Sequence, residues 1–116
     1  FNCFMKQVMS KEAIELWEAW IDLQCADDNS KGTLFVWGEL CVGNSLSEPV
    51  LVKRKIQGAN PTHLYLEVVP YIIENDGRIT ETRYSEPVHN LTQYNRIVIC
   101  AGEEVLVEIE NIDLLD

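Results

Sequence analysis

The sequence predicts a mainly β fold, an antiparallel six-stranded sandwich or flattened barrel with one N-terminal amphipathic α-helix. Three observations support this fold class. Hydrophobic residues make up 47% of the 116 residues, which is enough to fill a core. Beyond the first 32 residues the apolar positions recur with a period of two, and the connections between these runs are short, which favours antiparallel neighbours. The alternative is an α+β fold, a single curved antiparallel sheet wrapped on the helix.

The first part of the chain carries apolar residues at helical spacing. Ser10 is expected to cap a helix over residues 11–26. The apolar side chains of this segment fill one broad arc, formed by Ala13, Ile14, Leu16, Trp17, Trp20, Ile21, Leu23 and Cys25. The opposite face is acidic and carries Glu12, Glu15, Glu18 and Asp22. This separation predicts an amphipathic helix whose apolar side is buried.

Six strands are expected after the helix, over residues 33–42, 49–57, 63–73, 78–84, 95–101 and 104–112. The first and third are apolar on both sides, so we expect both of their faces to be covered. Asp76-Gly77 predicts a hairpin between the third and fourth strands, and Gly102 predicts another between the last two. The fourth strand is polar and is expected to be an exposed edge strand or a half-covered strand. Residues 1–116 are expected to form a single soluble domain.

Charge is unevenly distributed along the chain. Nine basic residues face 19 acidic ones, which gives a net charge of −10. The charges of residues 31–96 sum to zero, so the excess lies in the two terminal segments. Acidic ends repel nucleic-acid phosphates, and we therefore expect no nucleic-acid partner. Since no apolar run approaches the roughly 20 residues of a membrane-spanning helix, we expect no membrane span either.

The cysteines and histidines offer little for catalysis or metal binding. The four cysteines lack C-x-x-C spacing, so no metal site and no cofactor are expected. Cys41 or Cys100 with His89 is the least favoured alternative, a Cys/His enzyme, because thiols buried in strands are inert. We expect no catalytic residues and no enzymatic activity. Reduced thiols favour a cytoplasmic location, while Phe1 in place of an initiator Met leaves a removed leader peptide as an open alternative.

The charge pattern predicts protein–protein interaction through an acidic surface that attracts a basic protein partner. This surface is expected to join the acidic helix face to the last strand, through Glu12, Glu15, Glu18, Asp22, Glu104, Glu108 and Glu110. The alternative function is small-ligand or carbohydrate binding on an aromatic sheet face formed by Trp37, Tyr65 and Tyr71. The sequence leaves the identity of the partner and the oligomeric state open.

Overall fold

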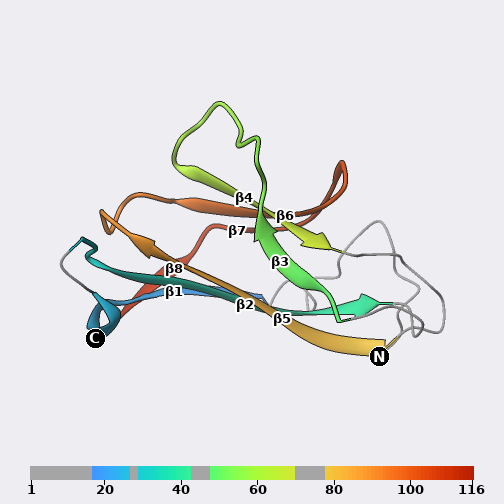
Figure 1. Ribbon diagram of the computed structural model, residues 1–116, viewed down its shortest axis with the longest axis horizontal. Coiled ribbons are helices and arrows are strands. Elements are labelled where there is room, and N and C mark those ends of the chain that lie inside the picture. The colour runs from blue at the N-terminus through green and yellow to red at the C-terminus, as the bar shows by residue number, and fades with distance from the viewer. Residues whose placement is uncertain (1–16, 27–28, 43–47, 70–77) are drawn as a thin grey trace.

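The computed structural model describes residues 17–26, 29–42, 48–69 and 78–116. The strands in these ranges are β1 Glu18–Asp22, β2 Gly32–Val42, β3 Val50–Lys53, β4 His63–Val69, β5 Arg78–Val88, β6 Arg96–Ala101, β7 Glu104–Ile109 and β8 Ile112–Leu115. They form two four-stranded sheets, sheet A in the order β5-β2-β1-β8 and sheet B in the order β3-β4-β6-β7. Figure 1 shows the sheets as two layers, with β2 and β5 in the lower one and β4 and β6 in the upper one.

The predicted mainly β class is confirmed, but several of its details are wrong. The flattened barrel and the single curved sheet are both wrong, because two separate sheets form and neither closes on itself. The described residues form eight strands where six were expected, and two pairs, β1 with β8 and β4 with β6, are parallel. Among the described residues there is no α-helix, and hence none long and apolar enough to cross a membrane.

A shared hydrophobic core holds the two sheets together. The side chains that are most completely buried come from both sheets and are Leu34, Val36 and Val88 of sheet A with Leu64, Leu66, Ile97 and Ile99 of sheet B. They occupy alternate strand positions, since successive side chains of a strand point to opposite faces of its sheet. Burial of these aliphatic groups therefore stabilises the two-layer arrangement.

The predicted helix over residues 11–26 is wrong where the structure describes it, from Trp17 onwards. Trp17, Ala19 and Ile21 are buried, and the intervening Glu18 is exposed, so the segment has the period of a strand. β1 pairs with β2 and β8, whose backbones satisfy its hydrogen bonds. A short 3₁₀ helix, Leu23–Cys25, follows it. Residues 11–16 lie outside the described residues.

The remaining predicted strands agree with the structure to different degrees. The expectations for 33–42 and 95–101 are confirmed to within one residue by β2 and β6. The strand expected over 49–57 ends at Lys53, whereas the one expected over 78–84 extends to Val88 and lies at an edge of sheet A. The segment expected over 104–112 is divided, because the chain passes from sheet B to sheet A between β7 and β8.

Two expected hairpins have different outcomes. The β6–β7 hairpin is confirmed, and Gly102 has the positive φ of 63° that such a turn requires. For the hairpin expected between 63–73 and 78–84, β4 lies in sheet B while β5 pairs with β2 in sheet A, so the described parts of these two strands are not paired. Its turn residues lie outside the described residues. With β5 in the other sheet, β4 and β6 become parallel neighbours.

Two matching turns lead into the parallel strands β4 and β6. Asn60 Oδ1 accepts hydrogen bonds from the backbone N–H (2.9 Å) and hydroxyl (2.7 Å) of Thr62. Asn90 Oδ1 accepts the same pair from Thr92, at 2.9 and 2.8 Å. Asn95 N–H donates to the Thr62 carbonyl at 2.9 Å and so joins the starts of the two strands. These local bonds place the first residues of β4 and β6 side by side.

Candidate binding site

The outward side of sheet A carries three aromatic side chains. Strand alternation directs the buried Ala19 and Val36 inward, so that Trp20, Phe35 and Trp37 point outward, and all three remain partly exposed. We refer to Trp20, Phe35 and Trp37 as the aromatic face. The rings of Trp20 and Phe35 are stacked, with centroids 5.7 Å apart and an angle of 22° between their planes. Such an offset pair holds both rings in a defined orientation.

Strand register brings these residues together from distant parts of the chain. In the β1–β2 ladder Trp20 lies opposite Phe35, and Glu18 lies opposite Trp37. In the β2–β5 ladder Arg83 lies opposite Trp37. Directly opposed residues have Cβ atoms about 5 Å apart, so each of these pairs is in contact range. The aromatic face is thus set by the pairing of β1, β2 and β5.

A hollow of about 450 Å³ lies over this part of sheet A. Its lining residues come from all three strands and are Glu18, Trp20, Phe35, Trp37, Glu81 and Arg83. The volume is in the range of sites that hold small molecules or single side chains of a partner, which is roughly 300–1,000 Å³. The aromatic rings can bind by stacking, and the charged groups can bind by ion pairing.

Acidic groups outnumber basic ones around the hollow. Glu18 and Glu81 line it together with a single base, Arg83. Arg83 Nη2 lies 3.5 Å from Glu81 Oε1, and the side chains are 75% and 56% exposed, so this ion pair is weak. Glu39 lies directly opposite Glu81 across the β2–β5 ladder. The hollow is therefore both aromatic and negatively charged.

The expected ligand face of Trp37, Tyr65 and Tyr71 is only partly represented here. Trp37 lies in the aromatic face, whereas Tyr65 lies on β4 in sheet B, and Tyr71 falls outside the described residues. Trp20 was missed because the segment around it was interpreted as a helix. Phe35 shares with Trp37 the odd-numbered side of β2, and that shared side is the signal that could have identified it.

The described strand residues of the expected acidic surface lie on two different sheets. Glu18 lines the hollow of sheet A, and Asp22 ends the same strand, where its Oδ1 accepts a hydrogen bond from Gln24 N–H at 2.9 Å. Glu104 lies on β7 of sheet B. Glu12 and Glu15 lie outside the described residues.

Two further acids of that surface already have a cationic partner. Arg96 Nη1 donates to Glu108 Oε1 at 2.8 Å, and Arg96 Nη2 donates to Glu110 Oε1. One guanidinium thus compensates part of the negative charge at the end of β7. A basic ligand would have to compete with Arg96 for both carboxylates.

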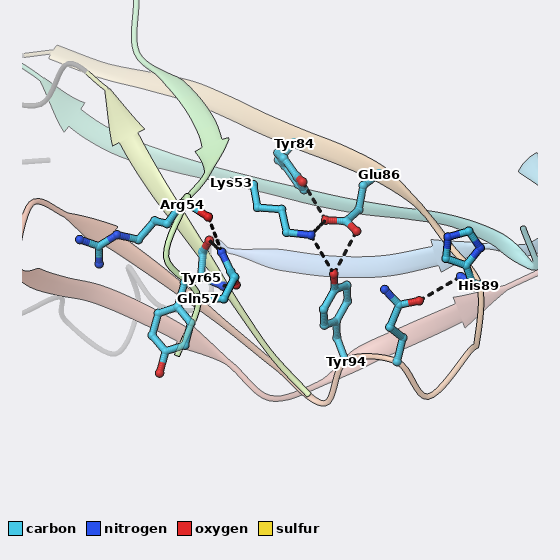
Figure 2. Close-up of polar contacts among 9 residues, drawn as sticks. Lys53, Arg54, Gln57, Tyr65, Tyr84, Glu86, His89 and Tyr94 are labelled. Atoms are coloured by element: carbon cyan, nitrogen blue, oxygen red, sulfur yellow. Dashed lines mark hydrogen bonds and ion pairs between the residues drawn. The ribbon is translucent and has the colours of Figure 1, made fainter. Parts of the chain in front are cut away.

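A polar cluster of Lys53, Tyr84, Glu86 and Tyr94 joins the two sheets at the β3–β5 edge. Figure 2 shows the other three side chains converging on Glu86. Its carboxylate accepts from Tyr84 Oη at 2.7 Å and from Tyr94 Oη at 3.0 Å, and it lies 3.6 Å from Lys53 Nζ. Lys53 Nζ also donates to Tyr94 Oη at 3.3 Å. Because its charges are matched internally, this cluster is a structural link between sheets.

Burial and the Glu86 carboxylate shift two pKa values in this cluster. Burial raises the pKa of Tyr84, and the bond to Glu86 raises it further because ionisation would place two negative charges together. For Lys53, burial disfavours the charged ammonium, but the bond to Tyr94 and the charge of Glu86 outweigh it and raise the pKa. Both groups therefore keep their protons more strongly in the folded chain.

Cys100 and His89, which were considered as a catalytic pair, contact different groups. Burial raises the pKa of Cys100, and although the Arg54 guanidinium opposes this effect, the net pKa stays raised and the reactive thiolate is disfavoured. His89 Nδ1–H donates to the Asn29 carbonyl at 2.7 Å. Side-chain contacts of Cys41 lie outside the described part of the structure. Within that part, no group of three His, Cys, Asp or Glu residues could hold a metal ion.

Comparison of the chain with protein-family models, with curated proteins and with solved structures gives no match. The interpretation of the site therefore depends on its own residues. Those residues combine stacked aromatic rings with exposed carboxylates on one sheet face. This arrangement is suited to binding a ligand by contact and charge.

Proposed function

We propose that this chain is a non-enzymatic binding domain that holds a segment of a protein partner on the outer face of sheet A. The observation that carries the proposal is the aromatic face, three partly exposed rings gathered around one hollow. Aromatic side chains bury a large area on binding and lose little conformational entropy. They are therefore the residue types that dominate protein interfaces.

The surroundings of the aromatic face resemble the layout of a small protein interface. Trp20 and Trp37 form an apolar centre, and Glu18, Glu81 and Arg83 form a charged rim. Interfaces commonly have a core enriched in aromatic residues and a polar rim that stays hydrated. Trp and Arg are also the residue types most enriched among those that contribute strongly to binding. This layout favours a protein partner over a purely apolar ligand.

The proposal retains part of the acidic surface expected from the sequence. Glu18 remains in it, because it lines the hollow beside the aromatic rings. The acids at the end of β7 are left out, since Arg96 pairs with Glu108 and Glu110. The proposed site is therefore smaller and more apolar than a surface defined by charge alone.

Binding of a neutral carbohydrate to the same face is the second candidate function. The stacked rings of Trp20 and Phe35 favour it, because flat aromatic surfaces hold the apolar faces of sugar rings. A neutral sugar would bind almost independently of salt, whereas contacts to the charged rim weaken as salt screens them. Titration at low and high ionic strength therefore distinguishes the two candidates.

An array of immobilised short peptides of varied composition tests the proposed function. We compare the unaltered chain with Trp37→Ala and with a control, Ile56→Ser, whose side chain is 86% exposed and outside the aromatic face. The unaltered chain and the control should retain the same peptides, and Trp37→Ala should lose them. Equal retention by all three, or retention of no peptide at all, would refute a partner site on this face.

A further inference from the structure

We infer that the hollow on sheet A holds a cationic side chain, the guanidinium or ammonium group of an arginine or lysine in the partner segment. This inference rests on the proposed function and specifies the ligand chemistry of the same site. It follows from the rings of the hollow, from its carboxylates, and from an opposed pair of acids on adjacent strands, of which one, Glu81, lines the hollow.

The rings of the aromatic face provide the first argument. The face of an aromatic ring carries partial negative charge and attracts a cation that lies within about 6 Å of its centre, most strongly for tryptophan. In the described part of the chain, the lysine that lies over a ring is Lys53, at 6.0 Å from the centre of Tyr94 and in the cluster that joins the sheets. Within that part of the chain, the rings of Trp20 and Trp37 have no cation over them and can receive one.

The carboxylates of the hollow provide the second argument. Glu18 and Glu81 line it with one base, Arg83, so the lining carries one more negative than positive charge. Arg83 is only weakly attached to Glu81, at 3.5 Å between highly exposed groups. Glu18 is placed opposite Trp37 and can pair with a cation that lies against that ring. A neutral or acidic ligand would add no positive charge to that of Arg83 beside these carboxylates.

The opposition of Glu39 and Glu81 provides the third argument. Like charges directly opposite each other on antiparallel strands destabilise the pairing. Both residues occupy outward positions of sheet A, in the row next to Trp37 and Arg83. A cationic side chain bound beside them would relieve this repulsion. Sheet stability alone gives no reason for this pair, whereas recognition of a cation does.

The overall charge of the chain favours the same class of partner. With a net charge of −10, the chain attracts basic segments over distances longer than a direct contact. This attraction increases the rate of encounter and is weakened by salt. Long-range charge therefore brings a basic segment to the chain, and the aromatic hollow selects the side chain that is bound.

Two peptides that differ only in charge test this inference. One carries arginine at two positions of a glycine-rich sequence, and the other carries citrulline, which has the shape of arginine without its charge, at the same positions. Each is titrated into the full chain while tryptophan fluorescence is recorded. We expect the arginine peptide to bind at least about tenfold more tightly, which is the ratio produced by one charge-assisted contact. A neutral oligosaccharide is titrated in parallel.

Variants of the chain assign the effect to the hollow. Glu18→Gln and Glu81→Gln should each weaken binding of the arginine peptide about three- to tenfold and leave the citrulline peptide unchanged. Glu104→Gln on β7 is the matched control, since it removes one exposed carboxylate from the other sheet and should change neither affinity. Because these changes affect exposed groups, circular dichroism should show unaltered folding.

The outcomes separate this inference from the proposed function. If the two peptides bound equally and Trp37→Ala abolished binding of both, recognition of a cation would be refuted, while the proposed partner site would be supported. Binding that is insensitive to Trp37→Ala would overturn both. Preference for the oligosaccharide, or failure of the arginine peptide to bind, would also overturn the cation. If Glu104→Gln weakened binding as much as Glu18→Gln, the charge preference would come from general attraction to the acidic chain. The inference that the hollow binds the cation would then be refuted.

Discussion

Replacement of Gly38 by alanine should strongly destabilise the fold, because the Trp17 indole lies against its Cα. A Cβ built on Gly38 would lie 2.1 Å from Trp17 Cδ2 and 2.2 Å from Cε3. The ring would have to retreat by about 1.3 Å to reach an ordinary contact of 3.4 Å. Trp17 is only 5% exposed, and core packing leaves no such space.

The structure sets a lower and an upper value for this effect. If the ring shifts within the core, overpacking costs about 1–3 kcal/mol. If the ring leaves the core, the loss approaches the roughly 3–5 kcal/mol of a Trp→Ala substitution. We therefore expect Gly38→Ala to lower the free energy of unfolding by about 3 kcal/mol. With a typical urea dependence, the unfolding midpoint falls by more than about 1 M.

A double-mutant cycle with Trp17→Leu tests the cause of this loss. Urea unfolding is followed by circular dichroism, since the second substitution removes a fluorophore. Once the indole is absent, alanine at Gly38 should cost almost nothing, because its backbone has no positive φ. It should even stabilise by about 0.4–1 kcal/mol through the unfolded chain. Gly102→Ala is the control, since its φ of 63° causes strain without any contact and its cost should be independent of Trp17.

One result would refute this reasoning directly. If Gly38→Ala were equally destabilising with and without the indole, the contact between Trp17 and Gly38 would not be the cause. A neutral Gly38→Ala in the unaltered chain would show that Trp17 does not occupy this position.

Three further predictions concern the rest of the sheet system. The pKa values of Tyr84 and Lys53 are raised in the folded chain, so the protonated side chains stabilise the fold fully at neutral pH. This stabilisation is lost as the pH rises above the ordinary pKa values of 10.0 and 10.5, and the urea midpoint of unfolding should fall in that range. The fall should be less steep for Tyr84→Phe. Gln57→Ala should cost about 1–3 kcal/mol in urea unfolding and speed hydrogen exchange of the Tyr65 amide, because the Gln57 side chain accepts from Tyr65 N at 2.8 Å and donates to its carbonyl at 3.0 Å. Arg96→Met should free the carboxylates of Glu108 and Glu110 without improving binding of the arginine peptide, and a clear gain in affinity would relocate the site.

The mainly β class could be predicted from the sequence because apolar and polar positions alternate clearly in most core strands. That β1 is a strand could not be predicted, for a physical reason. Trp17 and Ile21 are four residues apart, a spacing that lies on one face of a helix and also on one face of a strand. Only the intervening Ala19 and Trp20 distinguish the two. Partners at a distance, β2 and β8, decide the outcome by supplying hydrogen bonds on both sides of β1.

The pairing of strands also could not be predicted from local sequence patterns. Short connections predict antiparallel neighbours within one sheet, yet β5 leaves β4 and pairs with β2. The sheet choice follows from burial at a distance, since Thr82 and Val88 of β5 face the interior beside β2. The candidate site depends on this choice, because Arg83 reaches Trp37 only when β5 lies next to β2. Hence Trp37 and Phe35 could be found from the alternation of β2, while their neighbours on β1 and β5 could not.

Strand alternation separates stability from binding in sheet A, and this separation is itself testable. Leu34 points into the core and is fully buried, so Leu34→Ala should cost about 2–5 kcal/mol and leave the peptide affinity of the folded fraction unchanged. Trp20→Ser and Trp37→Ser change outward, partly exposed side chains, and they should reduce the peptide affinity of the folded fraction in addition to any stability lost with the stacked Trp20–Phe35 pair. Thermal unfolding and fluorescence titration of the same samples compare the two effects. If the inward and outward substitutions reduced affinity equally, binding would depend on general integrity of the fold, and the aromatic face would lose its proposed role.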